Sequence, residues 1–152
     1  MTSNRQRCAV GLAILLFAAD TAVAASKKKY YLTTTTHTGA QALNACDKKF
    51  HMASLFEILD VTSLTYDTAR GFSDEDSGSG PPSGEWGWIR TGHFAYNGFD
   101  IPSLPNCLAW TTTDGHGTQV SLPVVWGAAS STSPWTAQSI ACLTESRVWC
   151  VK

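Results

Sequence analysis

Several patterns that identify common enzymes are missing from this chain. No two of its 4 histidines stand four residues apart, which is the spacing of the helical zinc motif of many metalloproteases. There is no Gly-x-Ser-x-Gly elbow and no Walker-type phosphate loop. Serine, histidine and aspartate occur in most soluble chains, so they predict a catalytic triad only where geometry joins them. A hydrolase-type enzyme therefore has no motif to support it, and it remains an alternative to a binding protein.

Charged residues are also scarce, and neither sign predominates. Charged residues make up 15% of the chain, and the formal net charge is −1. The one basic cluster along the sequence is Lys27–Lys29. Binding to phosphate backbones requires a basic face rather than one short tag. We therefore expect no nucleic-acid partner.

Long apolar runs are limited to the N-terminus, which has the layout of a secretory signal peptide. Arg5 and Arg7 precede an apolar run over residues 9–19, and small residues follow up to Ala24. A membrane-spanning helix needs about 20 apolar residues, and this run is shorter. We predict that residues 1–24 are removed, that the mature chain has no transmembrane segment, and that it is secreted or periplasmic.

The cysteines that remain after such cleavage are even in number. Cys8 would leave with the leader, so 4 of the 5 cysteines would stay in a single domain over residues 25–152. In an oxidising compartment four cysteines predict two disulfides, and three pairings are open. A zinc site is less favoured because no Cys-x-x-Cys pair occurs among Cys46, Cys107, Cys142 and Cys150.

The secondary-structure signals place helices first and strands afterwards. Tyr30–Thr36 predicts a strand, and capping boxes that start at Thr38 and Ser54 predict a helix over about 39–49 and a second short helix. A Ser/Gly/Pro-rich loop follows from Gly71 to Gly84. Helices followed by strands indicate an α+β domain. The later predicted strands are Trp86–Thr91, Cys107–Thr112, Thr118–Leu122, Ser139–Leu143 and Arg147–Val151.

The order of cysteines and tryptophans adds a family resemblance. Cys46 falls in the first predicted helix, a Trp-Ile strand runs over 88–92, and an Asn-Cys-Leu-Ala-Trp segment spans 106–110. Cys142 and Cys150 then form a C-terminal pair eight residues apart at the last strand, Val-Trp-Cys-Val. Together these features resemble the C-type-lectin-like fold in the wide sense that includes endostatin-like domains and bacterial exported domains of unknown function.

This resemblance implies both a fold and a disulfide pairing. The implied fold is an α+β domain in which two N-terminal helices pack on a small antiparallel sheet with a long loop region. The implied disulfides are Cys46–Cys150, which would join the first helix to the last strand, and Cys107–Cys142, which would close the loop region.

The calcium site of sugar-binding members of that family has no counterpart here. The nearest segments are Leu104-Pro105-Asn106 and Trp110-Thr111-Thr112, and both lack the carboxylates that calcium requires. Asp74, Glu75 and Asp76 are adjacent in a polar loop, a pattern more typical of solvated side chains than of a calcium loop. We expect no metal and no cofactor, and cation binding by this acidic run stays open as an alternative.

The 6 tryptophans are the most informative residues for binding. Trp88, Trp110 and Trp149 lie within strand patterns and are predicted to be core. The predicted ligand-binding residues lie in the loop region over 71–117, although a structural role stays open for its aromatics. These residues are Trp86, Arg90, His93, Tyr96, Phe99 and Asp100.

The sequence thus favours an exported, non-catalytic recognition or scaffold module that binds a glycan or protein ligand without calcium. A structural component of an envelope or appendage is a third alternative, because a fold alone does not decide function.

Overall fold

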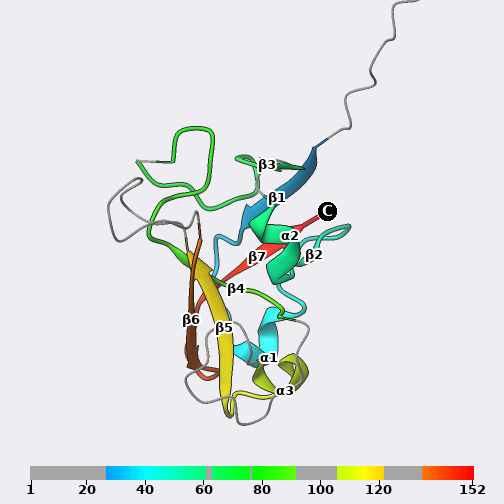
Figure 1. Cartoon of the computed structure of the whole chain (residues 1–152), viewed down its shortest axis with the longest axis vertical. Coiled ribbons are helices and arrows are strands. Elements are labelled where there is room, and N and C mark those ends of the chain that lie inside the picture. Colours follow the sequence, from blue (N-terminus) through cyan, green and yellow to red (C-terminus); the bar gives the residue numbers. More distant parts are fainter. Residues whose placement is uncertain (1–26, 61–62, 76, 92–105, 122–134) are drawn as a thin grey trace, which may run out of the picture.

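The computed structural model describes residues 27–60, 63–75, 77–91, 106–121 and 135–152, and Figure 1 shows their arrangement. Seven strands and three short helices occur in these ranges. In chain order they are β1 (Lys28–Leu32), α1 (Gly39–Ala42), β2 (His51–Met52), α2 (Leu55–Leu59), β3 (Leu64–Tyr66), β4 (Trp86–Trp88), α3 (Cys107–Trp110), β5 (His116–Ser121), β6 (Thr136–Ala141) and β7 (Arg147–Val151).

One mixed sheet organises these elements around β7. The strand order is β3-β1-β7-β4-β5-β6, and β2 also pairs with β7. β1 runs antiparallel to β7, with Tyr31 opposite Cys150, whereas β4 runs parallel to β7, with Trp88 opposite Val148. Residues 148–151 of β7 are all buried, which suits a central strand covered on both faces. The predicted bounds of this strand are confirmed.

The predicted fold class is wrong. The described residues form a mixed seven-stranded sheet with three short helices, not two N-terminal helices packed on a small antiparallel sheet. The helix predicted over 39–49 ends at Ala42, because Asn44 and Ala45 already donate to carbonyls three residues back. Cys46 is then held by its disulfide to β7. A helix this short has little stability of its own, so tertiary contacts decide where it stops.

The strand predicted over 107–112 is also wrong. Residues 107–110 have φ between 47° and 64° and form the left-handed turn α3. This conformation costs L-residues about 1–2 kcal/mol each. Two contacts hold the turn: the Cys107–Cys142 disulfide, and the Asn106 side chain, which bonds both the backbone and the hydroxyl of Thr91. Tertiary contacts again override the local preference for a strand.

The core forms where tryptophans meet across the sheet. Trp88 and Trp149 are 0% exposed and Trp110 is 4% exposed, which confirms all three as core residues. The Trp149 indole packs edge-on against Trp135 at 5.2 Å between ring centroids and donates to the Val120 carbonyl at 3.0 Å. Trp88 packs edge-on against Trp110 at 5.6 Å. The buried indole N–H of Trp88 also has a backbone partner, the His37 carbonyl at 2.8 Å.

Two disulfides fix the ends of the helical segments to this sheet. Cys46 is bonded to Cys150, 104 residues away, and Cys107 to Cys142, 35 residues away. These are the pairs that the family resemblance implies. The first bond ties the turn after α1 to the central strand, and the second ties α3 to the turn after β6. α1 and α3 consequently lie side by side at one end of the molecule (Figure 1).

Candidate binding surfaces

Two of the six predicted ligand-binding residues, Trp86 and Arg90, belong to the described part of the chain. His93, Tyr96, Phe99 and Asp100 lie outside the described residues. Trp86 is half-buried in β4, where its carbonyl accepts a hydrogen bond from Ser146.

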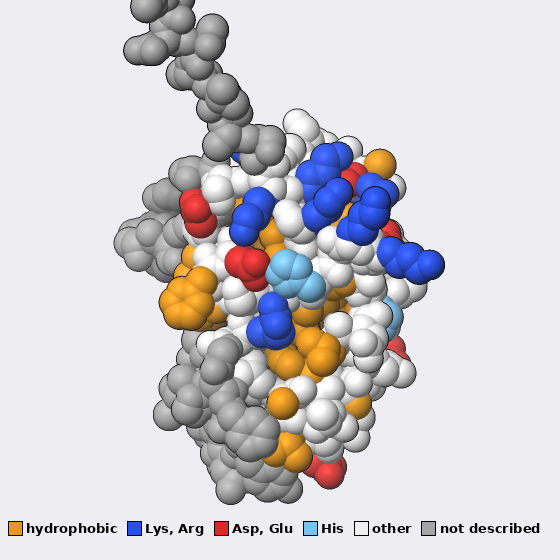
Figure 2. All heavy atoms as spheres, turned by 90° about the vertical axis from the view of Figure 1, so that its right-hand side faces the viewer, with side chains coloured by type: hydrophobic (Ala, Val, Ile, Leu, Met, Phe, Trp, Pro, Cys, Tyr) orange, Lys and Arg blue, Asp and Glu red, His pale blue; other side chains and the backbone are white. Residues whose placement is uncertain are grey.

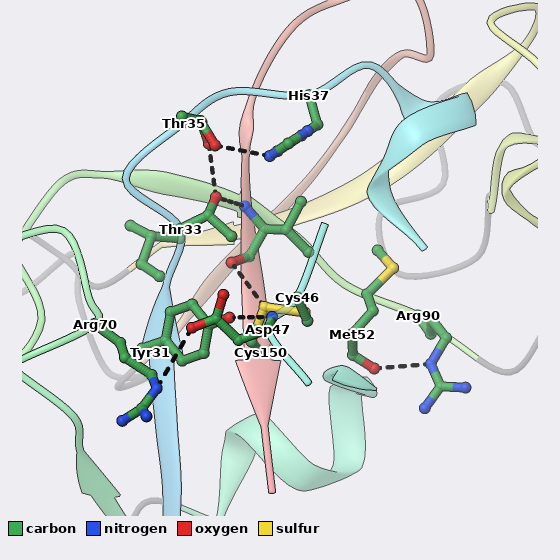
Figure 3. The surroundings of a disulfide bond; sticks show 12 residues. Tyr31, Thr33, Thr35, His37, Cys46, Asp47, Met52, Arg70, Arg90 and Cys150 are labelled. Atoms are coloured by element: carbon green, nitrogen blue, oxygen red, sulfur yellow. Dashed lines mark hydrogen bonds and ion pairs between the residues drawn. A yellow bond between two sulfur atoms is a disulfide. The ribbon is translucent and has the colours of Figure 1, made fainter. Parts of the chain in front are cut away.

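Arg90 is half-buried as well. Its Nε donates to the Met52 carbonyl at 2.9 Å, which Figure 3 shows, so this side chain has a structural contact. The proposed binding site in the loop region over 71–117 therefore stays a prediction.

The acidic run in the same loop region holds its own turn. The Asp74 backbone N–H donates to the Ser77 hydroxyl at 2.7 Å, and the Asp74 carboxylate accepts from the Glu75 backbone at 2.8 Å. Both acidic residues are exposed, and Asp76 lies outside the described residues. Within the part of the chain that the structure describes, no three His, Cys, Asp or Glu side chains come close enough to hold a metal ion.

A polar pocket of about 260 Å³ lies next to the Cys46–Cys150 disulfide, and we call it the threonine pocket. Sequence reasoning missed it. It forms where the end of β1, the turn after α1 and the segment after β3 meet (Figure 3). The lining residues are Tyr31, Thr33, Thr34, Thr35, Ala45, Asp47, Ala69 and Arg70.

One wall of this pocket carries a pair of opposite charges. Arg70 Nε lies 3.4 Å from Asp47 Oδ2, and Arg70 Nη1 lies 2.8 Å from Asp67 Oδ2. Figure 3 shows the Asp47 carboxylate and the Arg70 guanidinium pointing toward each other. Asp67 is buried, which by itself raises the pKa of its carboxyl group, but Arg70 and Lys29 together hold that pKa below its usual value. Arg70 is thus anchored from beneath by a charged carboxylate.

The opposite wall is fixed to the sheet by hydrogen bonds. The Tyr31 hydroxyl accepts from the Asp47 backbone N–H at 2.7 Å, directly beside the Cys46–Cys150 disulfide. Burial raises the pKa of Tyr31, so its hydroxyl stays protonated. The Thr33 hydroxyl accepts from the Val148 N–H at 2.9 Å and donates to the Thr35 carbonyl at 2.7 Å. The pocket is therefore preformed on rigid elements.

A histidine outside the lining contacts one of the threonines of the pocket. The Thr35 hydroxyl lies 2.9 Å from His37 Nε2. Partial burial lowers the pKa of His37, and this effect outweighs the nearby Glu145 carboxylate, which raises it. His37 is accordingly neutral at neutral pH, and its ring fixes the orientation of the Thr35 hydroxyl.

A second cluster joins Ser54, Glu57 and His51 but does not have the order of a catalytic triad. The Ser54 hydroxyl donates to Glu57 Oε2 at 2.8 Å, and His51 Nε2 lies 3.0 Å from Glu57 Oε1. In a triad the histidine contacts the serine, whereas here the carboxylate lies between the two. Burial raises the pKa of Glu57, but the bonds from Ser54 and His51 lower it overall. This cluster is the predicted capping box of α2 with a histidine added.

No protein-family model, curated protein or solved structure matches the chain. The comparisons thus give no support to the family resemblance.

The structure also enlarges the basic cluster seen in the sequence. Lys48, Lys49 and Lys152 come to the same end of the sheet as Lys27–Lys29, because β1 and β2 both pair with the end of β7. Figure 2 shows blue side chains gathered toward one corner of this face, with apolar side chains elsewhere on it. None of the helices that the structure describes is both long and apolar enough to span a membrane.

Proposed function

We propose that the mature chain is an exported, non-catalytic recognition module and that the threonine pocket binds a hydroxyl-rich ligand such as a sugar. The observation that carries this proposal is the preformed pocket beside the Cys46–Cys150 disulfide. Export is supported by the secretory leader pattern and by two disulfides, which persist in oxidising compartments.

The polar groups of the pocket suit a ligand that both donates and accepts hydrogen bonds at each hydroxyl. Asp47 offers carboxylate oxygens, and its side chain is 61% exposed. Arg70 offers guanidinium donors and is 46% exposed, and Thr34 adds a hydroxyl at the rim. Specific sites place a few polar groups in a concave, preformed surface. The Tyr31 ring is only 3% exposed, so it cannot stack on a sugar ring, and we expect weak affinity for a single sugar.

Saturation-transfer NMR of the disulfide-bonded mature chain with a panel of hexoses, N-acetylhexosamines and uronic acids tests this proposal. Asp47→Asn keeps the size of the side chain and removes its charge, and Thr34→Val keeps the shape and removes the hydroxyl. We expect each substitution to weaken binding about 5- to 10-fold, because each removes one hydrogen bond of about 1 to 1.5 kcal/mol.

Matched controls are available at positions that do not line the pocket. Asp114→Asn and Thr113→Val make the same chemical changes at exposed positions before β5, and they should leave binding unchanged. Failure of every sugar in the panel to bind, or equal losses in the pocket and control variants, would remove the pocket as the recognition site.

A further inference from the structure

The end of the sheet where β1 starts and β7 finishes collects lysines from three separate parts of the chain. The Lys152 N–H donates to the Lys29 carbonyl at 2.9 Å, so the first and last described segments are neighbours. The Lys152 ammonium lies 6.0 Å above the Phe50 ring, and Lys48 and Lys49 directly precede that ring. We call this surface the basic end; its lysines are Lys27, Lys28, Lys29, Lys48, Lys49 and Lys152, and all are exposed.

Few of these lysines are neutralised by a described partner. Lys29 Nζ lies 3.6 Å from the buried Asp67 carboxylate, while Asp47 pairs with Arg70. Glu57 and Asp60 add two carboxylates beside Lys28. Six lysines and Arg70 thus lie with four acidic residues, so cations still outnumber anions at this end, although the whole chain carries a net charge of −1. The acidic residues Asp74, Glu75, Glu85, Asp114 and Glu145 belong to other segments of the chain. The basic end therefore carries a net positive charge and attracts anions over several ångströms.

Exposed apolar side chains lie beside the lysines. Phe56 on α2 is 79% exposed and Leu59 is 43% exposed. Lys28 and Phe56 line the same surface hollow of about 210 Å³ together with Glu57, Asp60 and Ser63, so cationic, acidic and aromatic groups are adjacent here. Figure 2 shows lysine, acidic and apolar side chains together on the face that carries α2 and β2.

We propose that the basic end docks the protein on a membrane surface of anionic phospholipids. Clusters of four to eight basic residues bind such surfaces, and neighbouring Phe and Leu side chains enter the boundary between head groups and acyl chains. The charges are carried by lysines, which act as mobile point charges suited to a diffuse anionic surface and not to bidentate recognition of one group.

Other polyanions fit these observations less well. Single-stranded nucleic acid stacks successive bases on several aromatic rings, whereas Phe56 is the one large exposed aromatic side chain in the described part of the chain. Recognition of double-stranded nucleic acid relies strongly on arginine, and the basic end has one arginine beside it, Arg70. The exposed Phe56 and Leu59 have no role in binding a phosphate backbone, whereas a lipid surface accounts for them.

The test is co-sedimentation of the disulfide-bonded mature chain with vesicles of phosphatidylcholine alone and of phosphatidylcholine mixed with phosphatidylglycerol. We expect binding to the mixed vesicles only, with affinity falling as salt rises. Lys48→Gln with Lys49→Gln should weaken the binding about 25-fold, because each lysine contributes about fivefold near an anionic surface. Both residues are exposed and neither makes an ion pair in the described part of the chain, so these variants should fold.

Two matched controls separate local from general effects. Thr113→Glu with Thr136→Glu makes the same change in net charge at exposed positions near β5 and on β6, and should weaken binding far less. Phe56→Ser should weaken binding, whereas Leu143→Ser, at a 68% exposed position in the turn before β7, should not.

Three outcomes would overturn the proposal. The first is equal binding to neutral and anionic vesicles. The second is equal losses in the basic-end and control variants. The third is lysine-dependent binding to double-stranded DNA or heparin that matches or exceeds vesicle binding, which would assign the surface to soluble polyanions. The threonine-pocket variants at Thr34 and Asp47 are measured separately, so failure here does not decide the proposed function.

Discussion

Gly87 lies where one added methyl group tests the packing of the core. A Cβ on this β4 residue would lie 2.6 Å from Leu32 Cδ1 and 2.6 Å from Trp149 Cδ1. Ordinary carbon contacts are about 3.5 to 4.0 Å, so something would have to move by about 1 Å. Leu32 and Trp149 are both 0% exposed, and the Trp149 indole is fixed by its bond to the Val120 carbonyl.

We therefore expect Gly87→Ala to lower the free energy of unfolding by about 2 to 3 kcal/mol, near the upper end for overpacking. Gly80→Ala is the matched control, because its nearest neighbour would be the Ser77 carbonyl at 3.6 Å. Neither glycine has a positive φ, so both backbones accept alanine. The control should be neutral or stabilising by up to about 1 kcal/mol, since alanine restricts the unfolded chain.

Urea unfolding followed by tryptophan fluorescence measures both variants. The indole N–H resonance of Trp149 should also shift in Gly87→Ala and stay in place in Gly80→Ala. A difference below about 0.5 kcal/mol between the two variants would refute the described contact of β4 with Leu32 and Trp149.

Three further predictions concern stability. Replacing Cys46 and Cys150 by alanine should lower the free energy of unfolding by about 4 to 5 kcal/mol, because their bond closes a loop of 104 residues. Denaturant unfolding measures this change, and a decrease below about 2 kcal/mol would argue against loop closure as the cause of the stabilisation. Trp110→Ala should lower the free energy of unfolding by about 3 to 5 kcal/mol and Trp86→Ala by clearly less, because Trp110 is buried and Trp86 is half-buried. Equal decreases in the two variants would show that Trp86 is a core residue. Arg70 and Lys29 hold the pKa of the buried Asp67 carboxyl below its usual value, so the stabilisation from its charge is present at neutral pH and is lost in acid, as pH falls through that lowered pKa; the melting temperature of Asp67→Asn should be lower at neutral pH and should fall less steeply in acid.

The sequence predicted the start of a helix correctly where the contacts that fix that start lie between residues close in sequence. The capping box at Ser54 starts α2, and its serine and glutamate bond each other as the spacing predicts. The capping box at Thr38 likewise starts α1. Helix lengths were not predictable, since the residue at which α1 ends depends on a disulfide partner more than 100 positions away. The turn at α3 likewise depends on Thr91 and Cys142, which no local pattern reveals.

The threonine pocket shows why the candidate site was missed. Its walls come from residues near 33, 47 and 70, and no spacing in the sequence relates them. They meet because β1 pairs with β3 on one side and with β7 on the other, while Cys46 is bonded to β7. The run of threonines over 33–36 was the feature of the sequence that could have predicted the pocket, but a run of β-branched residues indicates a strand first.

The basic end depends on the same sheet register as the threonine pocket, and Arg70 belongs to both surfaces. Arg70 lines the threonine pocket and also lies over the Phe50 ring at 5.6 Å, beside the lysine of the C-terminus. A substitution of Arg70 would therefore weaken both surfaces and release the buried Asp67 from its partner, so its effect could not be assigned. Lys48 and Lys49 carry charge outside the pocket, and Thr34 lines the pocket without charge. Substitutions at these positions should therefore act on one surface each, and their combined effect should be additive if pocket and basic end bind independently.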